Sequence, residues 1–119
     1  MSLARELAQF VNSTSFNDLP PLALERAKMV LASTFASAAM GRDISSARIM
    51  RALARERSGT PEASIWFDPA PRLPLADVAR VNATMSDAAA SDDSDLRNIA
   101  HIGTIVSSTS IATAERSGS

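Results

Sequence analysis

The sequence predicts an all-α fold, a helical bundle of about five helices. Two observations support this prediction. Apolar side chains recur at helical spacing through most of the chain, and only one short run, residues 63–67, resembles a strand. A chain of 119 residues with 45% apolar and 21% charged residues is typical of one folded unit. We therefore expect residues 1–119 to form a single helical domain or a fragment of a larger helical domain.

The first two predicted helices differ in length and in surroundings. A short helix is expected over residues 3–12, and a long one runs from residues 18–19 to a stop at Gly41. Beyond Met29 the long helix is apolar nearly all round, so it should be a buried central element. A chain of this size can hardly cover such a helix on every side. Together with the end of the chain at residues 117–119, this predicts additional protein mass around the helix. The inward face of the long helix is predicted from its apolar positions, which are Leu24, Ala27, Leu31, Phe35 and Ala38.

A third helix is expected to be capped by Asp43 and to run to about Arg57. Its arginines 48, 51 and 55 form an outer stripe, which we interpret as a solvated face, with an anion or interface patch as the alternative. In the strand-like run that follows, Trp66 is expected to be a packing anchor rather than a ligand platform.

Two more helices complete the predicted order. The fourth helix should begin at or just before Asp77 and lose its pattern at residue 91. The last helix should cover residues 105–115, where small side chains allow close packing. Between them lies an acidic loop over residues 91–101.

Composition excludes several classes of function. The net charge is −1 and no basic stripe carries interleaved aromatic residues, so a nucleic-acid partner is not expected. With no cysteine in the chain there are no disulfides or thiolate metal sites, and a reducing compartment is favoured. Charges near the N-terminus argue against a signal peptide, and the longest apolar-rich run, residues 29–40, is too short to span a bilayer. The sequence therefore predicts a cytoplasmic protein without a membrane partner.

The acidic loop gathers the residue types that acid-base chemistry requires. Crowded carboxylates repel one another, which raises a pKa when the loop is partly buried. The only histidine of the chain ends the loop, and histidine exchanges protons near neutral pH. The N–H groups of the following helix start form an anion site. The candidate catalytic residues are therefore His101, Asp93 and Asp92, and the candidate substrate-binding residues are Ser94, Arg97, Gly103 and Thr104.

Other interpretations of this loop remain open. On composition alone, Ser91 to Asp95 would be a solvated turn with capping side chains, and a single histidine is more often structural than catalytic. No metal site is expected, because the acids lack the alternating spacing and terminal glutamate of an EF-hand loop, and zinc lacks ligands. The chain also has no Gly-x-Ser-x-Gly elbow and no phosphate-binding glycine loop.

The order of motifs resembles the N-terminal portion of the MmgE/PrpD family, which includes 2-methylcitrate dehydratase, cis-aconitate decarboxylase and iminodisuccinate epimerase. The resemblance spans nearly the whole chain but only part of a typical member. It rests on the following segments: Leu7-Ala8-Gln9-Phe10-Val11, residues 16–21, Glu25-Arg26-Ala27-Lys28, residues 79–83, His101-Ile102-Gly103 and residues 111–115.

The resemblance implies a mostly helical large domain plus a smaller α/β domain, commonly as a dimer, and a lyase or isomerase of small di- and tricarboxylates. It implies dehydration, decarboxylation or epimerisation without a metal or organic cofactor, by removal of a proton or carbon dioxide next to a carboxylate. Asp92 and Asp93 match the family's Asp-Asp pair, Ser94 follows that pair, and His101 matches the histidine of a His-Pro-Gly turn. These residues would line the active site.

The sequence also departs from the family pattern. Asp87 stands where the family often has histidine, Ala90 where it has another acid, and Ile102 where it has proline. Further His, Lys and Tyr residues of the family site lie outside this sequence. Two hypotheses follow: an enzyme whose site is completed by another chain, in a homo- or hetero-oligomer, or a non-catalytic helical interaction or regulatory module built on the same scaffold. A third possibility is a fragment of a longer enzyme.

Overall fold

The structure is a computed structural model that describes residues 2–97 and 99–119. Within these ranges every regular element is helical and no strand forms, which confirms the all-α prediction. In chain order the elements are α1 (Leu3–Ser13), the 3-10 turn η1 (Phe16–Asp18), α2 (Pro21–Gly41), α3 (Ser45–Glu56), α4 (Leu75–Ala88), the π-helical turn η2 (Gly103–Ser107) and α5 (Ser108–Ser117).

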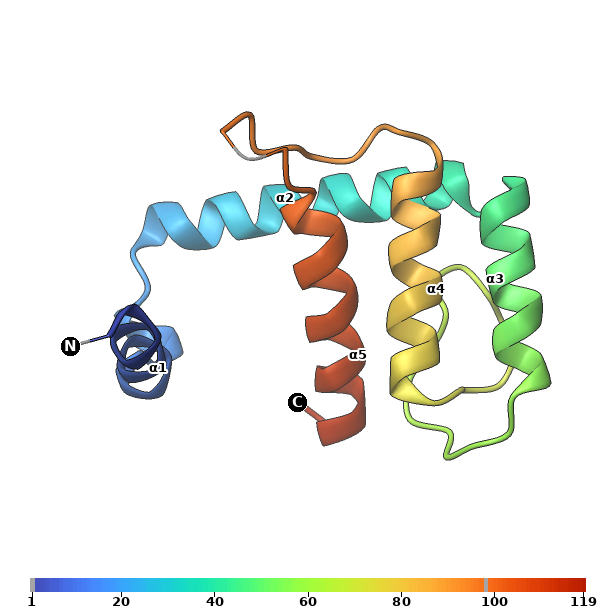
Figure 1. Cartoon of the computed structure of the whole chain (residues 1–119), viewed down its shortest axis with the longest axis horizontal. Coiled ribbons are helices and arrows are strands. Elements are labelled where there is room, and N and C mark those ends of the chain that lie inside the picture. Colours follow the sequence, from blue (N-terminus) through green and yellow to red (C-terminus); the bar gives the residue numbers. More distant parts are fainter. Residues whose placement is uncertain (1, 98) are drawn as a thin grey trace.

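The helices form a row beneath one long helix (Figure 1). Helix α2 runs along the top of the view, and α5, α4 and α3 descend from it side by side. Helix α4 is central, because it packs against α2, α3 and α5. Helix α1 stands apart at the blue end of the chain, and none of its residues is buried. The compact part of the fold is therefore α2 to α5.

The core of the compact part is centred on α4. Val78, Val81 and Met85 are fully buried, as the helical spacing predicts. A Cβ atom at Gly41 would lie 2.0 Å from the backbone oxygen of Met85, so only glycine permits this approach of α2 to α4. Helix α2 does end at Gly41, as predicted, but the glycine serves this close contact rather than a left-handed cap.

Beyond Met29, where a buried central element is predicted, α2 is buried on one face only in this chain, in line with the expectation that a chain of this size can hardly cover it. All buried residues of α2 lie from Thr34 onward, whereas Leu22, Met29 and Met40 are 59% to 68% exposed. The radius of gyration is 15.6 Å, against about 13.5 Å for a compact domain of this length. The chain alone offers too little mass to cover the helix.

The start of α3 and the strand-like run also differ from prediction. Helix α3 begins at Ser45, and Asp43 is not its cap because its carboxylate pairs with Arg42 and Arg51. Residues 63–67 form no strand, since only Ala63 makes a bridge, to Leu73.

The segment of residues 63–67 is instead held by buried side chains. The carboxamide oxygen of Asn82 on α4 accepts a hydrogen bond from the backbone N–H of Trp66 at 3.0 Å, and its NH₂ group donates to the backbone carbonyl of Ser64 at 3.3 Å. The Trp66 ring is buried, with its centroid 4.6 Å from that of Phe35. The prediction that Trp66 is a packing anchor is confirmed.

The arginine stripe of α3 has definite partners. Arg51 and Arg55 both pair with Asp68, whose side chain is largely buried in the following segment. Two of the three arginines are thus used to hold that segment against α3. Among the described residues, no helix is both long enough and apolar enough to cross a membrane.

Candidate functional site

The acidic loop leaves the end of α4 and returns at η2 after passing over α2 (Figure 1). The chain turns out of α4 through Ala89 and Ala90, the latter with a positive φ of 49°. The Ser91 hydroxyl then donates to the buried Ser37 hydroxyl of α2 at 3.2 Å. This anchoring turns the next two residues, Asp92 and Asp93, back toward the start of η2.

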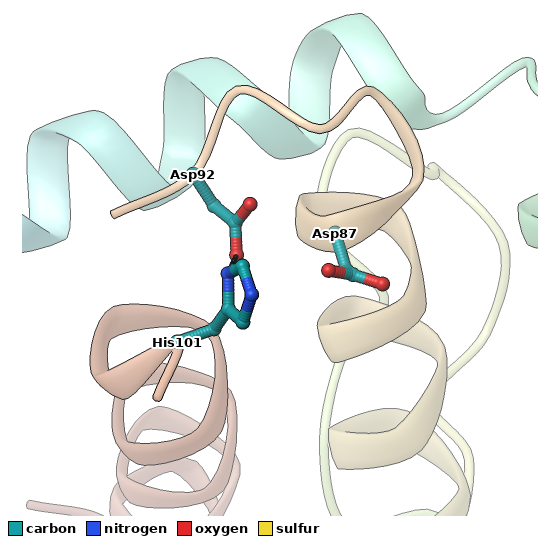
Figure 2. Close-up of side chains that lie close together, drawn as sticks. All are labelled: Asp87, Asp92 and His101. Atoms are coloured by element: carbon teal, nitrogen blue, oxygen red, sulfur yellow. Dashed lines mark hydrogen bonds and ion pairs between the residues drawn. The ribbon is translucent and has the colours of Figure 1, made fainter. Parts of the chain in front are cut away.

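Asp92 and His101 form the centre of the site. The Asp92 side chain is only 1% exposed, and its Oδ2 lies 2.8 Å from Nδ1 of His101 (Figure 2). The same oxygen accepts a hydrogen bond from the Thr104 hydroxyl at 2.8 Å. A buried carboxylate requires such donors, which places the proton of the neutral imidazole on Nδ1. Nε2 of His101, whose side chain is 43% exposed, then keeps its lone pair.

The Asp93 carboxylate contacts the backbone of Gly103. Its carboxylate accepts from the Gly103 N–H, at 2.9 Å to Oδ1 and 3.1 Å to Oδ2, and so caps the start of η2. A Cβ atom at Gly103 would lie 2.2 Å from Asp93 Oδ1 and 2.7 Å from the Thr34 hydroxyl, so any larger residue here would displace these side chains. We expected this N–H to receive a substrate carboxylate, but in the structure Asp93 already occupies it.

Ser94 and Arg97 lie on the outer side of the loop. Ser94 is exposed, and the Arg97 side chain is 91% exposed. Arg97 pairs with Asp95, and its backbone N–H donates to Asp95 Oδ1 at 2.9 Å. This backbone hydrogen bond, followed by the one from the Arg97 side chain, lowers the pKa of Asp95. The structure thus brings together His101, Asp92 and Thr104 but not Ser94 or Arg97.

An open pocket of about 330 Å³ adjoins His101. Its walls are residues of α4 and of the start of the last helix, namely Ala83, Thr84, Asp87, His101, Thr104 and Ile105. Asp87 faces the imidazole from the last turn of α4 (Figure 2). Sequence reasoning treated Asp87 only as a departure from the family. The spacing of residues 83, 84 and 87 could have placed it on the helical face beside the loop.

The π-helical turn η2 directs Thr104 toward this site. Because one extra residue fits into the turn, η2 departs from the regular α-helical path just after His101. Thr104 is buried there, and its hydroxyl lies 3.2 Å from that of Ser86 on α4. Thr104 therefore links α4, the loop and η2 through one hydroxyl group.

The chain as a whole matches one known family. The model of the MmgE/PrpD N-terminal domain matches residues 5–119. The chain belongs to the MmgE/PrpD family. No curated protein and no solved structure matches the chain significantly. Family membership accounts for the helical scaffold, whereas the chemistry of the pocket has to be argued from its residues.

Proposed function

We propose that the chain forms one wall of the active site of an MmgE/PrpD-type lyase or isomerase acting on small di- or tricarboxylates. The observation that carries the proposal is the pair of Asp92 and His101. A buried carboxylate orients a half-exposed imidazole, and the imidazole lies at an open pocket. This combination is that of a positioned acid-base group.

In the proposed reaction, Nε2 of His101 exchanges a proton with the carbon next to a substrate carboxylate. The C–H bond breaks, the proton moves to Nε2, and the electron pair is delocalised into the adjacent carboxylate. Asp92 stabilises the imidazolium that results, because its carboxylate is 2.8 Å from Nδ1. Departure of the hydroxyl group of the neighbouring carbon, protonated to water, would then give dehydration, and reprotonation from the opposite face by a second acid would give epimerisation. In a decarboxylation the C–C bond to the carboxylate breaks first, carbon dioxide leaves, and the protonated Nε2 delivers its proton to the carbon.

The proposal includes a further chain that completes the site. Large apolar side chains of α1 and of the N-terminal half of α2 remain uncovered among the described residues, since Leu7, Phe10 and Met29 are more than half exposed. An apolar surface of this kind is typical of a contact with other protein mass. In a homo- or hetero-oligomer that mass would also provide cationic groups for the substrate carboxylates.

Deuterium exchange tests the proposed proton transfer without knowledge of the full reaction. The tagged chain is isolated from its own cells with the proteins that bind it, and incubated in D₂O with a panel of hydroxylated and unsaturated di- and tricarboxylates. We expect the assembly to incorporate deuterium next to a carboxylate, measured by mass spectrometry. His101→Asn keeps a donor for Asp92 and should reduce the rate by about 10²–10⁴-fold. Ser110→Ala, an exposed change on α5, is the matched control.

An assembly that leaves every compound of the panel unlabelled would overturn the proposal. So would a His101→Asn assembly that labels as fast as the wild type. Circular dichroism of both variants separates loss of chemistry from loss of structure.

A second candidate function is a non-catalytic interaction module. It is favoured by Asp87, which puts an acid where the family often has histidine, and by Arg97, which points away from the pocket. This function predicts that His101→Asn and Ser94→Ala leave partner binding intact while Met29→Ser weakens it. Loss of activity in the loop variants with retained binding would exclude this candidate.

A further inference from the structure

The Thr104 hydroxyl and the His101 imidazole share one acceptor. Thr104 is only 6% exposed, and its hydroxyl donates to Asp92 Oδ2 at 2.8 Å. Nδ1 of His101 lies 2.8 Å from that same oxygen. The two donors therefore converge on one oxygen of a carboxylate whose side chain is 1% exposed. How strongly Asp92 attracts the imidazole proton thus depends on the hydroxyl of Thr104.

The direction of these hydrogen bonds follows from the chemistry of the groups. An ionised carboxylate only accepts, so the single proton of the Thr104 hydroxyl points to Asp92. The lone pairs of that hydroxyl are then free to accept from Ser86 on α4, whose fully buried hydroxyl lies 3.2 Å away. The Ser86 hydroxyl also lies 3.0 Å from the Ala83 carbonyl, its alternative acceptor. Helix α4 thus reaches the carboxylate through Thr104.

We propose that Thr104 is a positioning residue that keeps His101 in the neutral form, the form that accepts a proton. A buried carboxylate attracts a cation strongly, because water does not screen it. Without the hydroxyl, Oδ2 of Asp92 would have the imidazole alone as its donor and would hold it as the imidazolium, whose Nε2 has no lone pair. The hydroxyl of Thr104 balances part of the carboxylate charge, so Asp92 orients the imidazole without keeping it protonated.

The other charges at the pocket act in the same direction as Asp92. Asp87 faces the imidazole from the last turn of α4 (Figure 2), and that turn contains no basic residue. Among the described residues that line the pocket, none is basic apart from His101 itself. The α2 side chains against the start of η2 are those of Val30 and Thr34, which carry no charge. Both acids favour the charged imidazole, and the Thr104 hydroxyl opposes them through Asp92.

NMR titration of His101, the only histidine, tests this role on the 119-residue chain. Thr104→Val keeps the side-chain shape and removes the hydroxyl. In this variant we expect the imidazole to take up its proton at a pH about one unit higher than in the wild type, since hydrogen bonds to charged groups contribute free energies of that order. Thr104→Ser keeps the hydroxyl and should titrate like the wild type. Thr109→Val is the matched control, because the Thr109 side chain is exposed and donates to the Ile105 carbonyl one turn earlier.

A second variant keeps the test decisive if Thr104→Val does not fold, as judged by circular dichroism. Ser86→Ala removes the donor behind Thr104 and should shift the midpoint in the same direction by a smaller amount. A wild-type midpoint in both variants would overturn the role of Thr104. Equal shifts in Thr104→Val and Thr109→Val would overturn it too, as would a Thr104→Ser midpoint shifted like that of Thr104→Val.

The catalytic consequence of this role rests on the proposed function, but the two fail separately. In the deuterium exchange assay, the Thr104→Val assembly should be slower than the wild type at neutral pH and should recover as the pH rises by about one unit. A shifted midpoint in a wild-type assembly that exchanges no deuterium would overturn the enzyme alone. Exchange by the wild type with an unshifted midpoint in Thr104→Val would overturn only the role of Thr104.

Discussion

The two halves of α2 differ in how far the rest of the chain covers their side chains. From Thr34 onward the helix buries small side chains against α4, and Gly41 allows its backbone to touch that of Met85. Before Thr34 no residue is buried, although Leu22 and Met29 are large and apolar. Small residues were thus sufficient for internal packing, whereas the large apolar ones point to contacts outside the chain.

The candidate site lies at the boundary between these halves. Gly103 approaches both Val30 and Thr34 of α2, so the start of η2 is seated on the last unburied turn and the first buried one. Next to it lies an almost wholly apolar groove of about 360 Å³. The groove is lined by side chains of α2 and of the last helix, among them Ala27, Val30, Leu31, Ile102 and Val106. The Asp92–His101 pair therefore lies close to an apolar surface that the described residues leave uncovered.

The largest expected effect is a loss of unfolding free energy on substitution of Met85, which we compare with substitution of Met29. Met85→Ala removes a fully buried side chain of α4 and should lower the free energy of unfolding by about 3 kcal/mol, through lost burial and the cavity left behind. Met29→Ala on the exposed half should change it by less than about 0.5 kcal/mol. Urea unfolding of the isolated chain measures both. Comparable losses in the two variants would mean that the halves are equally packed in solution.

A smaller effect is expected at the boundary. Gly103→Ala forces a Cβ atom against Asp93 Oδ1 and the Thr34 hydroxyl, and should cost about 2 kcal/mol of unfolding free energy. The His101 NMR signals should shift as well, because the cap at Asp93 and the Asp92–His101 pair share the loop. An unchanged unfolding curve with unchanged His101 signals would show that η2 is not seated on α2.

The smallest effect concerns the outer side of the loop. The pKa of Asp95 is lowered chiefly by the Arg97 N–H, so the folded state favours the ionised carboxylate. Its contribution to stability is present above the ordinary aspartate pKa of 3.8 and is lost as the pH falls through the lower pKa of the folded state. The Arg97 amide signal should therefore shift in acid below that value. In Asp95→Asn this shift should be absent, and a titration at or above 3.8 in the wild type would contradict the hydrogen bond.

Helical periodicity predicted most of the fold because each helix of the compact part has an apolar face that meets a neighbour. Val78, Val81 and Met85 are the clearest case. The pattern failed where it could not specify a partner. It predicted a buried element for all of α2 beyond Met29, although Met40 is 68% exposed, and it assigned a strand-like run to residues 63–67, which Asn82 holds instead.

The site was predictable as a set of residue types but not as an arrangement. The loop was identified from its acids and its single histidine, and Asp92 and His101 do meet. The different contacts of Asp92 and Asp93 could not be predicted from the sequence. They depend on how the loop is folded, with Ser91 hydrogen-bonded to Ser37 and Asp93 to the Gly103 N–H. Asp87 was overlooked since it belongs to the preceding helix rather than to the loop.

The burial of Asp92 also constrains how this site could be lost in evolution. With a side chain 1% exposed, Asp92 depends on His101 and Thr104 for its hydrogen bonds. Losing one partner of a buried ion or hydrogen-bonded charge typically costs 3–5 kcal/mol. A lineage that no longer needed the imidazole could replace His101 first only by another hydrogen-bond donor, such as asparagine, or would have to replace Asp92 together with it. Folding thus limits which substitutions of His101 can come first.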